Sequence, residues 1–152
     1  MKRMHIHVAV EDIDASTRFY VAMFGGAKPT VSKSDYRKWE LSDPKVNFAI
    51  SQRGVKPGID HLGIQVESDD ELAEMRARLA SAELPVMNQT ATTCCYAKSN
   101  KTWTVDPQGV AWETFQTLEH APVYGESRDR SREARVSSIA CCAGADLNRS
   151  KT

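Results

Sequence analysis

One short pattern occurs twice in the chain, and this repeat limits the folds that the chain can adopt. Residues 5–11 read HIHVAVE and residues 61–67 read HLGIQVE, so His, Val and Glu recur in register 56 positions apart. In both copies Asp and Ser residues follow, which favour the start of a helix, and then apolar residues at helical spacing. A repeat of this length predicts two similar structural units built one after the other.

Each copy predicts a strand, a helix and three further strands, which is an α+β fold of two βαβββ modules, at about 1–55 and 56–120. The first copy predicts a helix over 13–24 and strands near 3–10, 27–33, 36–41 and 46–52. The second predicts a helix over 69–83 and strands near 59–67, 85–92, 94–105 and 110–117. The alternation of apolar and polar residues in HIHVAV and KWEL is typical of half-buried strands.

The apolar pattern ends after about Leu118. The segment ESRDRSREARVSS alternates in charge and has almost nothing apolar to bury. We therefore expect residues 121–152 to form a flexible tail that carries two cysteines, with a short helix around 129–140.

All four cysteines occur as adjacent pairs, at 94–95 and 141–142. Adjacent residues fit disulfide geometry poorly, and a reducing cytoplasm disfavours structural disulfides, so free thiols are expected. Between the proline after the helix and the next Asp-Pro pair the second copy has 21 positions and the first copy has 14. The seven additional residues surround the first cysteine pair, which predicts a mobile hairpin loop that serves a binding site.

The charge balance argues against polyanionic partners. Twenty basic and twenty acidic side chains cancel, so neither nucleic acid nor an anionic membrane is expected as the main partner. No stretch approaches the roughly 18 apolar residues that span a bilayer. We expect a soluble, cytoplasmic protein.

Histidines at equivalent positions of the repeat predict a metal site. His5 and His61 occupy the same place in the two copies, and Glu113 lies on the last predicted strand, where the first copy has Ala49. Two histidines and one carboxylate leave coordination positions open, as in non-haem Fe(II) oxygenases. A strand histidine alone is more often structural, but the recurrence in register favours the metal. His7 shares the face of His5 and is expected to be a packed core residue, with a hydrogen-bonding partner of a ligand or a substitute ligand as alternatives.

These features resemble a known superfamily. The paired βαβββ pattern, the H-x-x-V-x-V-x-D start, FY in the first helix and the segment VDPQGVAWE are similar to the vicinal oxygen chelate proteins. That group includes glyoxalase I, extradiol dioxygenases and the fosfomycin and bleomycin resistance proteins. The resemblance covers about residues 3–118 and implies a half-barrel of two modules around a metal site.

The segment TTCCYAKSNKTWTVDPQGVAWETF is more specifically similar to the carbon–arsenic lyases and their cadmium-inducible relatives. Those lyases are Fe(II)-dependent dioxygenases that remove organic groups from trivalent organoarsenicals. The resemblance implies His5, His61 and Glu113 as iron ligands, with dioxygen as co-substrate. It also implies Cys94 and Cys95 as the thiols that bind arsenic.

Several side chains near the cysteine pair have two possible interpretations: a contribution to the thiol site, or an ordinary role in solvent or in the core. Lys98 and Lys101 would favour the thiolate form electrostatically, although solvated loop lysines are the simpler expectation. Tyr96 would line a pocket for an aryl group, and Trp103 lies near it. Core packing is at least as well supported for both aromatic residues.

Two other functions remain open. A protein that sequesters cadmium or a metalloid needs soft thiol ligands but no turnover. A metal-dependent thiol-transfer or glyoxalase-type resistance enzyme also uses histidine and carboxylate ligands, but Ala49 leaves a four-ligand set incomplete and the thiols unexplained. The preferred organic group, the role of Cys141 and Cys142, and pairing of modules within one chain or across a homodimer also stay open.

Overall fold

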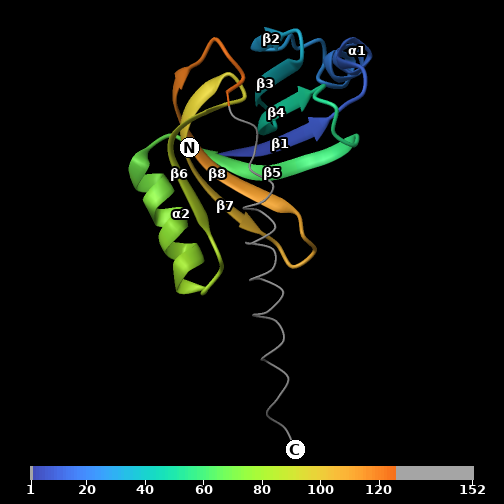
Figure 1. The fold of residues 1–152 in the computed structure, drawn as a ribbon. Coiled ribbons are helices and arrows are strands. Elements are labelled where there is room, and N and C mark those ends of the chain that lie inside the picture. The colour runs from blue at the N-terminus through green and yellow to red at the C-terminus, as the bar shows by residue number, and fades with distance from the viewer. Residues whose placement is uncertain (1, 126–152) are drawn as a thin grey trace, which may run out of the picture. The chain divides into compact units, whose positions relative to one another are not determined.

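A computed structural model describes residues 2–125 of the chain. Its elements alternate as the repeat predicts: β1 (Arg3–Ala9), α1 (Ile13–Met23), β2 (Val31–Lys33), β3 (Tyr36–Ser42), β4 (Lys45–Ser51), β5 (Gly58–Val66), α2 (Asp69–Ser81), β6 (Met87–Cys94), β7 (Ala97–Val105) and β8 (Ala111–His120). Figure 1 traces them along the chain. The α+β class with two βαβββ segments is confirmed, and the chain divides into two compact units between Gln65 and Val66.

The first unit is a mixed sheet with strands in the order β2-β3-β4-β1-β5. The strand β1 runs parallel to β4 and antiparallel to β5. The first strands of the two sequence copies are therefore paired, as the repeat predicts. Because successive residues of a strand point to opposite faces, β1 buries His5, His7 and Ala9 on one face.

The opposite face of β1 faces the hydrophobic core of the first unit. Ile6 and Val8 pack there against a buried cluster, which consists of Ile13, Trp39, Phe48 and Ile50. The helix α1 begins where the Asp12 carboxylate accepts hydrogen bonds from the N–H groups of Asp14 at 2.9 Å and Ala15 at 2.8 Å. Such a cap satisfies donors that the first turn of a helix leaves unpaired. The core thus holds one face of β1 and leaves its histidine face for other contacts.

The second unit contains α2 and the antiparallel strands β8, β7 and β6 in that order. Ser68 caps α2 by accepting a hydrogen bond from Glu71 N at 3.2 Å. From the middle of α2, Arg76 donates to Thr102 Oγ1 at 2.6 Å and to the carbonyl oxygen of Lys101 at 3.1 Å. These bonds attach the helix to β7 next to a buried lysine.

The seven additional residues of the second copy lengthen a hairpin and form no loop. The strand β6 has eight residues where β2 has three, and β7 has nine where β3 has seven, which accounts for all seven. Only Cys95 and Tyr96 connect β6 to β7. Both have positive φ, 56° and 60°, as turns of two residues between twisted strands need. The insertion was predicted correctly, but the turn lies two to three residues later than expected.

Residues 121–125 lie against this hairpin, although the sequence assigns them to the tail. Ala121 N donates to the carbonyl oxygen of Tyr96 at 2.8 Å, and Gly125 forms a β-bridge with Cys94. The apolar pattern of the sequence ends near Leu118, before this segment begins. The two backbone contacts of the segment do not require a periodic arrangement of apolar residues, so the sequence does not reveal them. The predicted helix around 129–140 and the pair Cys141-Cys142 lie outside the described residues.

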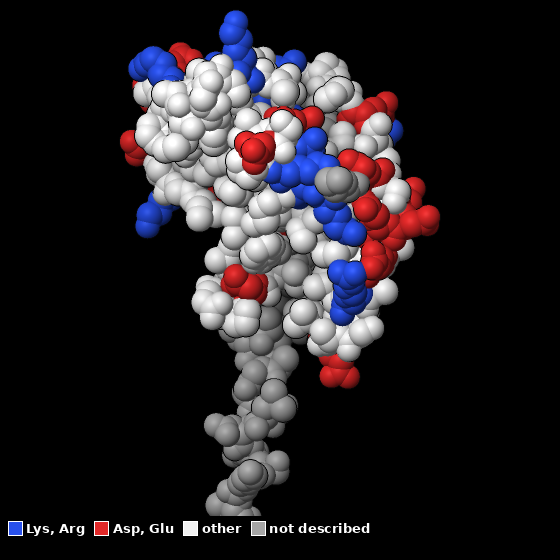
Figure 2. Space-filling view, turned by 180° about the vertical axis from the view of Figure 1, so that it is seen from behind, with Lys and Arg blue, Asp and Glu red and all other residues white. Residues whose placement is uncertain are grey.

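Charged side chains of both signs lie near one another on the face that Figure 2 shows. Ion pairs at the surface include Arg53 with Asp35 at 3.0 Å and Lys98 with Glu119 at 3.0 Å. Among residues 2–125, no helix has both the length and the apolar character needed to cross a membrane.

Candidate metal and thiol sites

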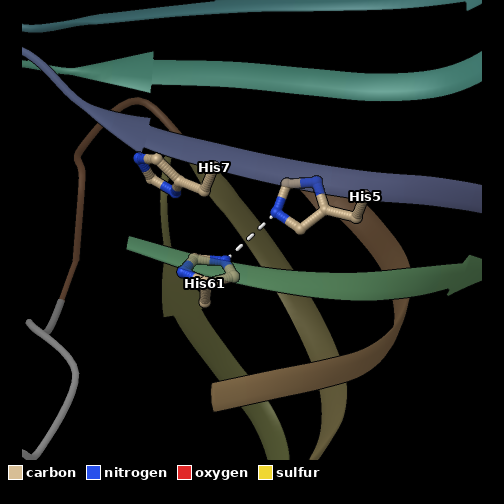
Figure 3. Close-up of side chains that lie close together, drawn as sticks. All are labelled: His5, His7 and His61. Atoms are coloured by element: carbon tan, nitrogen blue, oxygen red, sulfur yellow. Dashed lines mark hydrogen bonds between the residues drawn. The ribbon is translucent and has the colours of Figure 1, made fainter. Parts of the chain in front are cut away.

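The strands β1 and β5 bring three histidines together (Figure 3). His7 lies directly opposite His61 in the antiparallel register, and His5 lies opposite Gly63. Because Gly63 has no side chain, the imidazole of His5 can lean toward His61, its diagonal neighbour. The Nε2 atoms of His5 and His61 are 3.1 Å apart. All three rings are buried, with at most 5% of each residue exposed.

Hydrogen bonds at the outer nitrogens determine which nitrogen of each imidazole carries the proton. His5 Nδ1 is 3.0 Å from the carbonyl oxygen of Asn47, which can only accept, so Nδ1 is the protonated nitrogen. His61 Nδ1 is 2.7 Å from Asp60 Oδ2, and the same argument holds for a carboxylate. The two Nε2 atoms are in hydrogen-bond contact with each other, and once the proton between them is displaced both can present a lone pair to one metal ion, which is how metal-binding histidines are usually oriented by their partners.

The spacing of the two lone pairs fits a divalent metal ion. Imidazole nitrogens bind zinc at about 2.1 Å, so two ligands at a right angle lie about 3.0 Å apart. The observed separation of the Nε2 atoms is 3.1 Å. Imidazole suits zinc, copper, iron and nickel alike, so this pair indicates a transition-metal site and leaves the identity of the metal open.

His7 completes a cluster of three ring nitrogens that lie within 4.8 Å of one another. In the parallel register β1 places His7 beside Ala49 of β4, whose small buried side chain leaves room for the ring. Its Nε2 is 2.9 Å from Ser51 Oγ. This bond supports the structural reading of His7, while its place beside the pair keeps the substitute-ligand reading open.

Glu113 of β8 forms a buried ion pair with Lys101 of β7. Lys101 Nζ is 2.7 Å from Glu113 Oε1, and about 5% of each side chain is exposed. Burial alone would lower the pKa of Lys101, but the charge of Glu113, the charges of Cys94 and Cys95 and the hydrogen bond to Glu113 together outweigh burial and raise that pKa. The sequence suggests a role for each of these residues, but it does not predict that they form a pair. The signal was available, because Lys101 lies two residues before Trp103, which is opposite Glu113.

The turn that precedes β8 fixes the position of Glu113 along the strand. The Asp106 carboxylate accepts hydrogen bonds from Gln108 N and Val110 N, both at 2.9 Å, and from Trp112 Nε1 at 3.2 Å. These bonds, led by the one from Val110, lower the pKa of Asp106. The Asp-Pro-x-Gly segment and the tryptophan thus start the strand that carries Glu113. That Glu113 binds a metal together with His5 and His61 stays a prediction.

The two thiols at the tip of the β6–β7 hairpin lie within reach of one atom. Cys94 and Cys95 are both reduced and half-buried, and their sulfurs are 3.2 Å apart. The Cys95 thiol also donates a hydrogen bond to Tyr124 Oη at 3.3 Å. The rings of Tyr96 and Tyr124 pack edge to face with centroids 5.6 Å apart. A pair of sulfurs in aromatic surroundings suits a soft, thiophilic ligand.

Most contacts of the Cys95 thiol disfavour its thiolate form. The hydrogen bond to Cys94, then burial, raise its pKa well above the ordinary value, while the charge of Lys101 acts in the opposite direction. Lys101 therefore favours the thiolate, but the other effects are larger. Lys101 is buried and paired with Glu113, so the simpler expectation of a solvated loop lysine is wrong at this position. Lys98 is paired with Glu119. Trp103 is buried and donates from Nε1 to Gln89 Oε1 at 3.1 Å, which agrees with a packing role.

Comparison with known proteins gives consistent matches. The model of the Glyoxalase/Bleomycin resistance protein/Dioxygenase superfamily matches residues 2–114. The trivalent organoarsenical cleaving enzyme of Bacillus sp. (strain MD1) is 40% identical over 120 residues, 77% of this chain and 74% of that protein. The cadmium-induced protein CadI of Mycobacterium tuberculosis (strain ATCC 25618 / H37Rv) is 28% identical over 145 residues, 95% of each. The solved Mn(II)-bound glyoxalase from Novosphingobium aromaticivorans has a TM-score of 0.56 at 13% identity, over 92% of this chain and 53% of that one, a likeness of fold alone.

Proposed function

Because the chain belongs to the Glyoxalase/Bleomycin resistance protein/Dioxygenase superfamily, we propose that it is an Fe(II)-dependent dioxygenase that cleaves the carbon–arsenic bond of trivalent organoarsenicals. The observation that carries the proposal is the pair of reduced sulfurs 3.2 Å apart at the tip of the hairpin. Similarity to relatives that are named trivalent organoarsenical cleaving enzymes, at 40% and 35% identity, supports it.

Cys94 and Cys95 would capture the substrate. A trivalent arsenical with one organic group has two exchangeable hydroxyl groups, and two adjacent sulfurs can replace both. Each thiol gives up its proton, each hydroxyl leaves as water, and two arsenic–sulfur bonds replace two arsenic–oxygen bonds with no change in oxidation state. Chelation by both sulfurs fixes the direction of the remaining arsenic–carbon bond, which lowers the entropic cost of the later step.

His5 and His61 would hold the iron through Nε2, with Glu113 as the proposed third ligand. Asn47 and Asp60 keep both imidazoles in the tautomer that binds a metal. When bound, Fe(II) supplies the activation of dioxygen that this oxidation needs. The chain's own contribution is to orient two neutral imidazoles in a buried site, where bulk water does not compete for coordination.

Release of arsenite tests the proposal directly. Purified protein reconstituted anaerobically with Fe(II) is supplied with a thiol reductant, a trivalent methyl or phenyl arsenical, and then air. We expect inorganic arsenite together with an oxidised carbon fragment. Cys94→Ser and Cys95→Ser should abolish turnover and leave the iron content intact, while Thr90→Ser, an exposed change on the same strand, should behave as wild type.

Sequestration without turnover is the alternative, and the similarity to a cadmium-induced protein favours it as the second candidate. In that case the arsenical stays bound at one equivalent per chain and no arsenite forms. Loss of iron from the Cys94→Ser or Cys95→Ser variants would instead mean that the thiols belong to the metal site.

A further inference from the structure

The segment 121–125, which we name the clasp, is attached to the hairpin at both of its ends. At its start Ala121 N donates to the carbonyl oxygen of Tyr96 at 2.8 Å. At its end Gly125 pairs with Cys94 in a β-bridge. The clasp therefore contacts the backbone of both the first thiol residue and the turn beside the second.

Gly125 allows the clasp to approach closely. Its φ is 82°, and a Cβ atom at this position would lie 2.0 Å from the carbonyl oxygen of Thr93 and 2.4 Å from its carbonyl carbon. Backbone atoms cannot give way as the end of a flexible side chain can. A residue with a side chain would thus push the clasp away from β6 and from Cys94.

The clasp places Tyr124 against the second thiol and beside another tyrosine. Its hydroxyl accepts a hydrogen bond from Cys95 at 3.3 Å, and its ring meets the edge of Tyr96 at a centroid distance of 5.6 Å. Cys95 and Tyr96 both have positive φ, a conformation that costs about 1 kcal/mol or more in residues other than glycine. Contacts with the clasp help to hold the turn in this unfavourable conformation.

We propose that the clasp is part of the substrate site: the Tyr124 hydroxyl positions the Cys95 sulfur for chelation, and the Tyr96 and Tyr124 rings form an aromatic wall that favours aryl over methyl substituents on the bound metalloid. This inference rests on the proposed role of the thiol pair. A tyrosine hydroxyl can accept from the thiol and donate to the thiolate, so Tyr124 can keep contact with Cys95 while its proton leaves. An aryl group can make edge-to-face contacts with a tyrosine ring, which a methyl group cannot make.

Binding to the full-length, metal-free protein tests the proposal, with trivalent phenyl and methyl arsenicals as the two probes and with Cys141 and Cys142 replaced by Ser throughout, so that one adjacent thiol pair remains. Tyr124→Phe removes the hydroxyl and keeps the ring, so both affinities should fall by a similar factor, about two- to tenfold for one hydrogen bond. Tyr124→Ala also removes the ring, so the ratio of phenyl to methyl affinity should fall by a further factor of about two to ten. The matched control is Leu118→Ala, an exposed apolar position of β8 outside the clasp, which should leave both affinities unchanged.

The pH profile of Cys95 alkylation is a second readout. If Tyr124 only supported the fold, its replacement would not shift the midpoint of this profile. The profile is measured in a background in which Cys94, Cys141 and Cys142 are all replaced by Ser, so that Cys95 is the one thiol that can react. Because the hydrogen bond that the Tyr124 hydroxyl can donate to the thiolate is stronger than the one that it accepts from the thiol, we expect Tyr124→Phe to shift the midpoint of this profile to higher pH. Tyr124→Phe retains the ring that packs on Tyr96, so this variant tests the role of the hydroxyl group even if Tyr124→Ala does not fold.

The inference is overturned if Tyr124→Phe matches the wild type in both affinities and in the alkylation midpoint. It is also overturned if Tyr124→Ala folds and retains the wild-type preference for the phenyl probe. A wild-type protein that binds both probes but releases no arsenite after iron loading would refute the proposed function alone, because none of these binding measurements depends on iron.

Discussion

At the scale of single residues, the orientation of the two imidazoles is the feature on which a metal site depends. The sequence predicts the pair, because His5 and His61 recur in register. It does not predict what fixes their tautomers. Asn47 reaches His5 across a parallel strand pair. Asp60 precedes His61 just as Glu119 precedes His120, so adjacency alone does not reveal the contact. Contacts between strands distant in sequence leave no pattern in a single chain.

Replacing Asp60 should weaken metal binding without removing a ligand. In Asp60→Ala the His61 ring loses the carboxylate that holds its Nδ1 proton at 2.7 Å, so Nε2 is no longer fixed as the nitrogen with the lone pair. Changes at partners of metal-binding histidines typically cost about 10–100-fold in affinity, and we expect that range for Fe(II) in an anaerobic titration. Asp70→Ala, an exposed carboxylate of α2, is the control. Equal affinities in the two variants would show that Asp60 does not orient a ligand.

Glu113→Gln and His7→Gln distinguish the two candidates for the third ligand. We expect Glu113→Gln to deplete iron from the purified protein and His7→Gln to retain it, as metal analysis of reconstituted samples will show. Glu113→Gln also leaves the buried Lys101 ammonium without its counter-ion, which costs about 3–5 kcal/mol. The double variant Glu113→Gln/Lys101→Met removes that penalty and separates metal loss from unfolding. Iron retained without Glu113 and lost without His7 would assign the site to three histidines.

At the scale of elements, the sequence predicts the order and type of all ten helices and strands of the described chain, but it misplaces the turn at the thiols. The strand boundaries follow from alternation and from the prolines, which are local signals. The β6–β7 turn lacks the usual Asn-Gly or Asp-Gly signal, because Cys95 and Tyr96 occupy the positive-φ positions themselves. A turn formed by residues that disfavour its conformation cannot be located from propensity, and such strain is found most often at functional sites.

The two helices end in the same motif with different residues, and this difference predicts a stabilising change. After α1, Gly25 has φ 64°, and Gly26 N donates to Val21 O at 2.8 Å. After α2, Glu83 takes the glycine position with φ 54°, and Leu84 N donates to Leu79 O at 3.0 Å. Both are Schellman ends, in which glycine is preferred because it avoids the Cβ clash.

Glu83→Gly should therefore raise the free energy of unfolding by about 1 kcal/mol. In a chain of this size the melting temperature should rise by about 2–4 °C, as calorimetry can measure. The reciprocal change, Gly25→Glu, should lower the melting temperature by a similar amount. A destabilised Glu83→Gly variant would mean that the Glu83 side chain makes a contribution larger than the strain of its backbone.

At the scale of the whole molecule, the repeat is what makes the fold predictable, and departures from the repeat mark the candidate site. Equivalent positions hold His5 and His61, while Ala49 and Glu113 differ, and the seven added residues are found at the thiols. The sequence could not show that the fold continues past His120. The contacts of residues 121–125 come from the backbone of Ala121, a glycine and one tyrosine, and none of these residues belongs to a periodic pattern.

Two truncations test where the functional chain ends. The described contacts that reach the thiols end with the bridge of Gly125 to Cys94, so a chain of residues 1–125 should bind and turn over the arsenical as the full-length protein does. A chain of residues 1–120 lacks the clasp, so its affinity for the phenyl probe should fall at least as far as in Tyr124→Ala. Its Fe(II) affinity should stay unchanged, because His5, His61 and Glu113 all precede the cut. If the 1–125 chain were inactive, residues 126–152, with Cys141 and Cys142, would have to contribute to the reaction, and the clasp alone would not account for how the thiols are held.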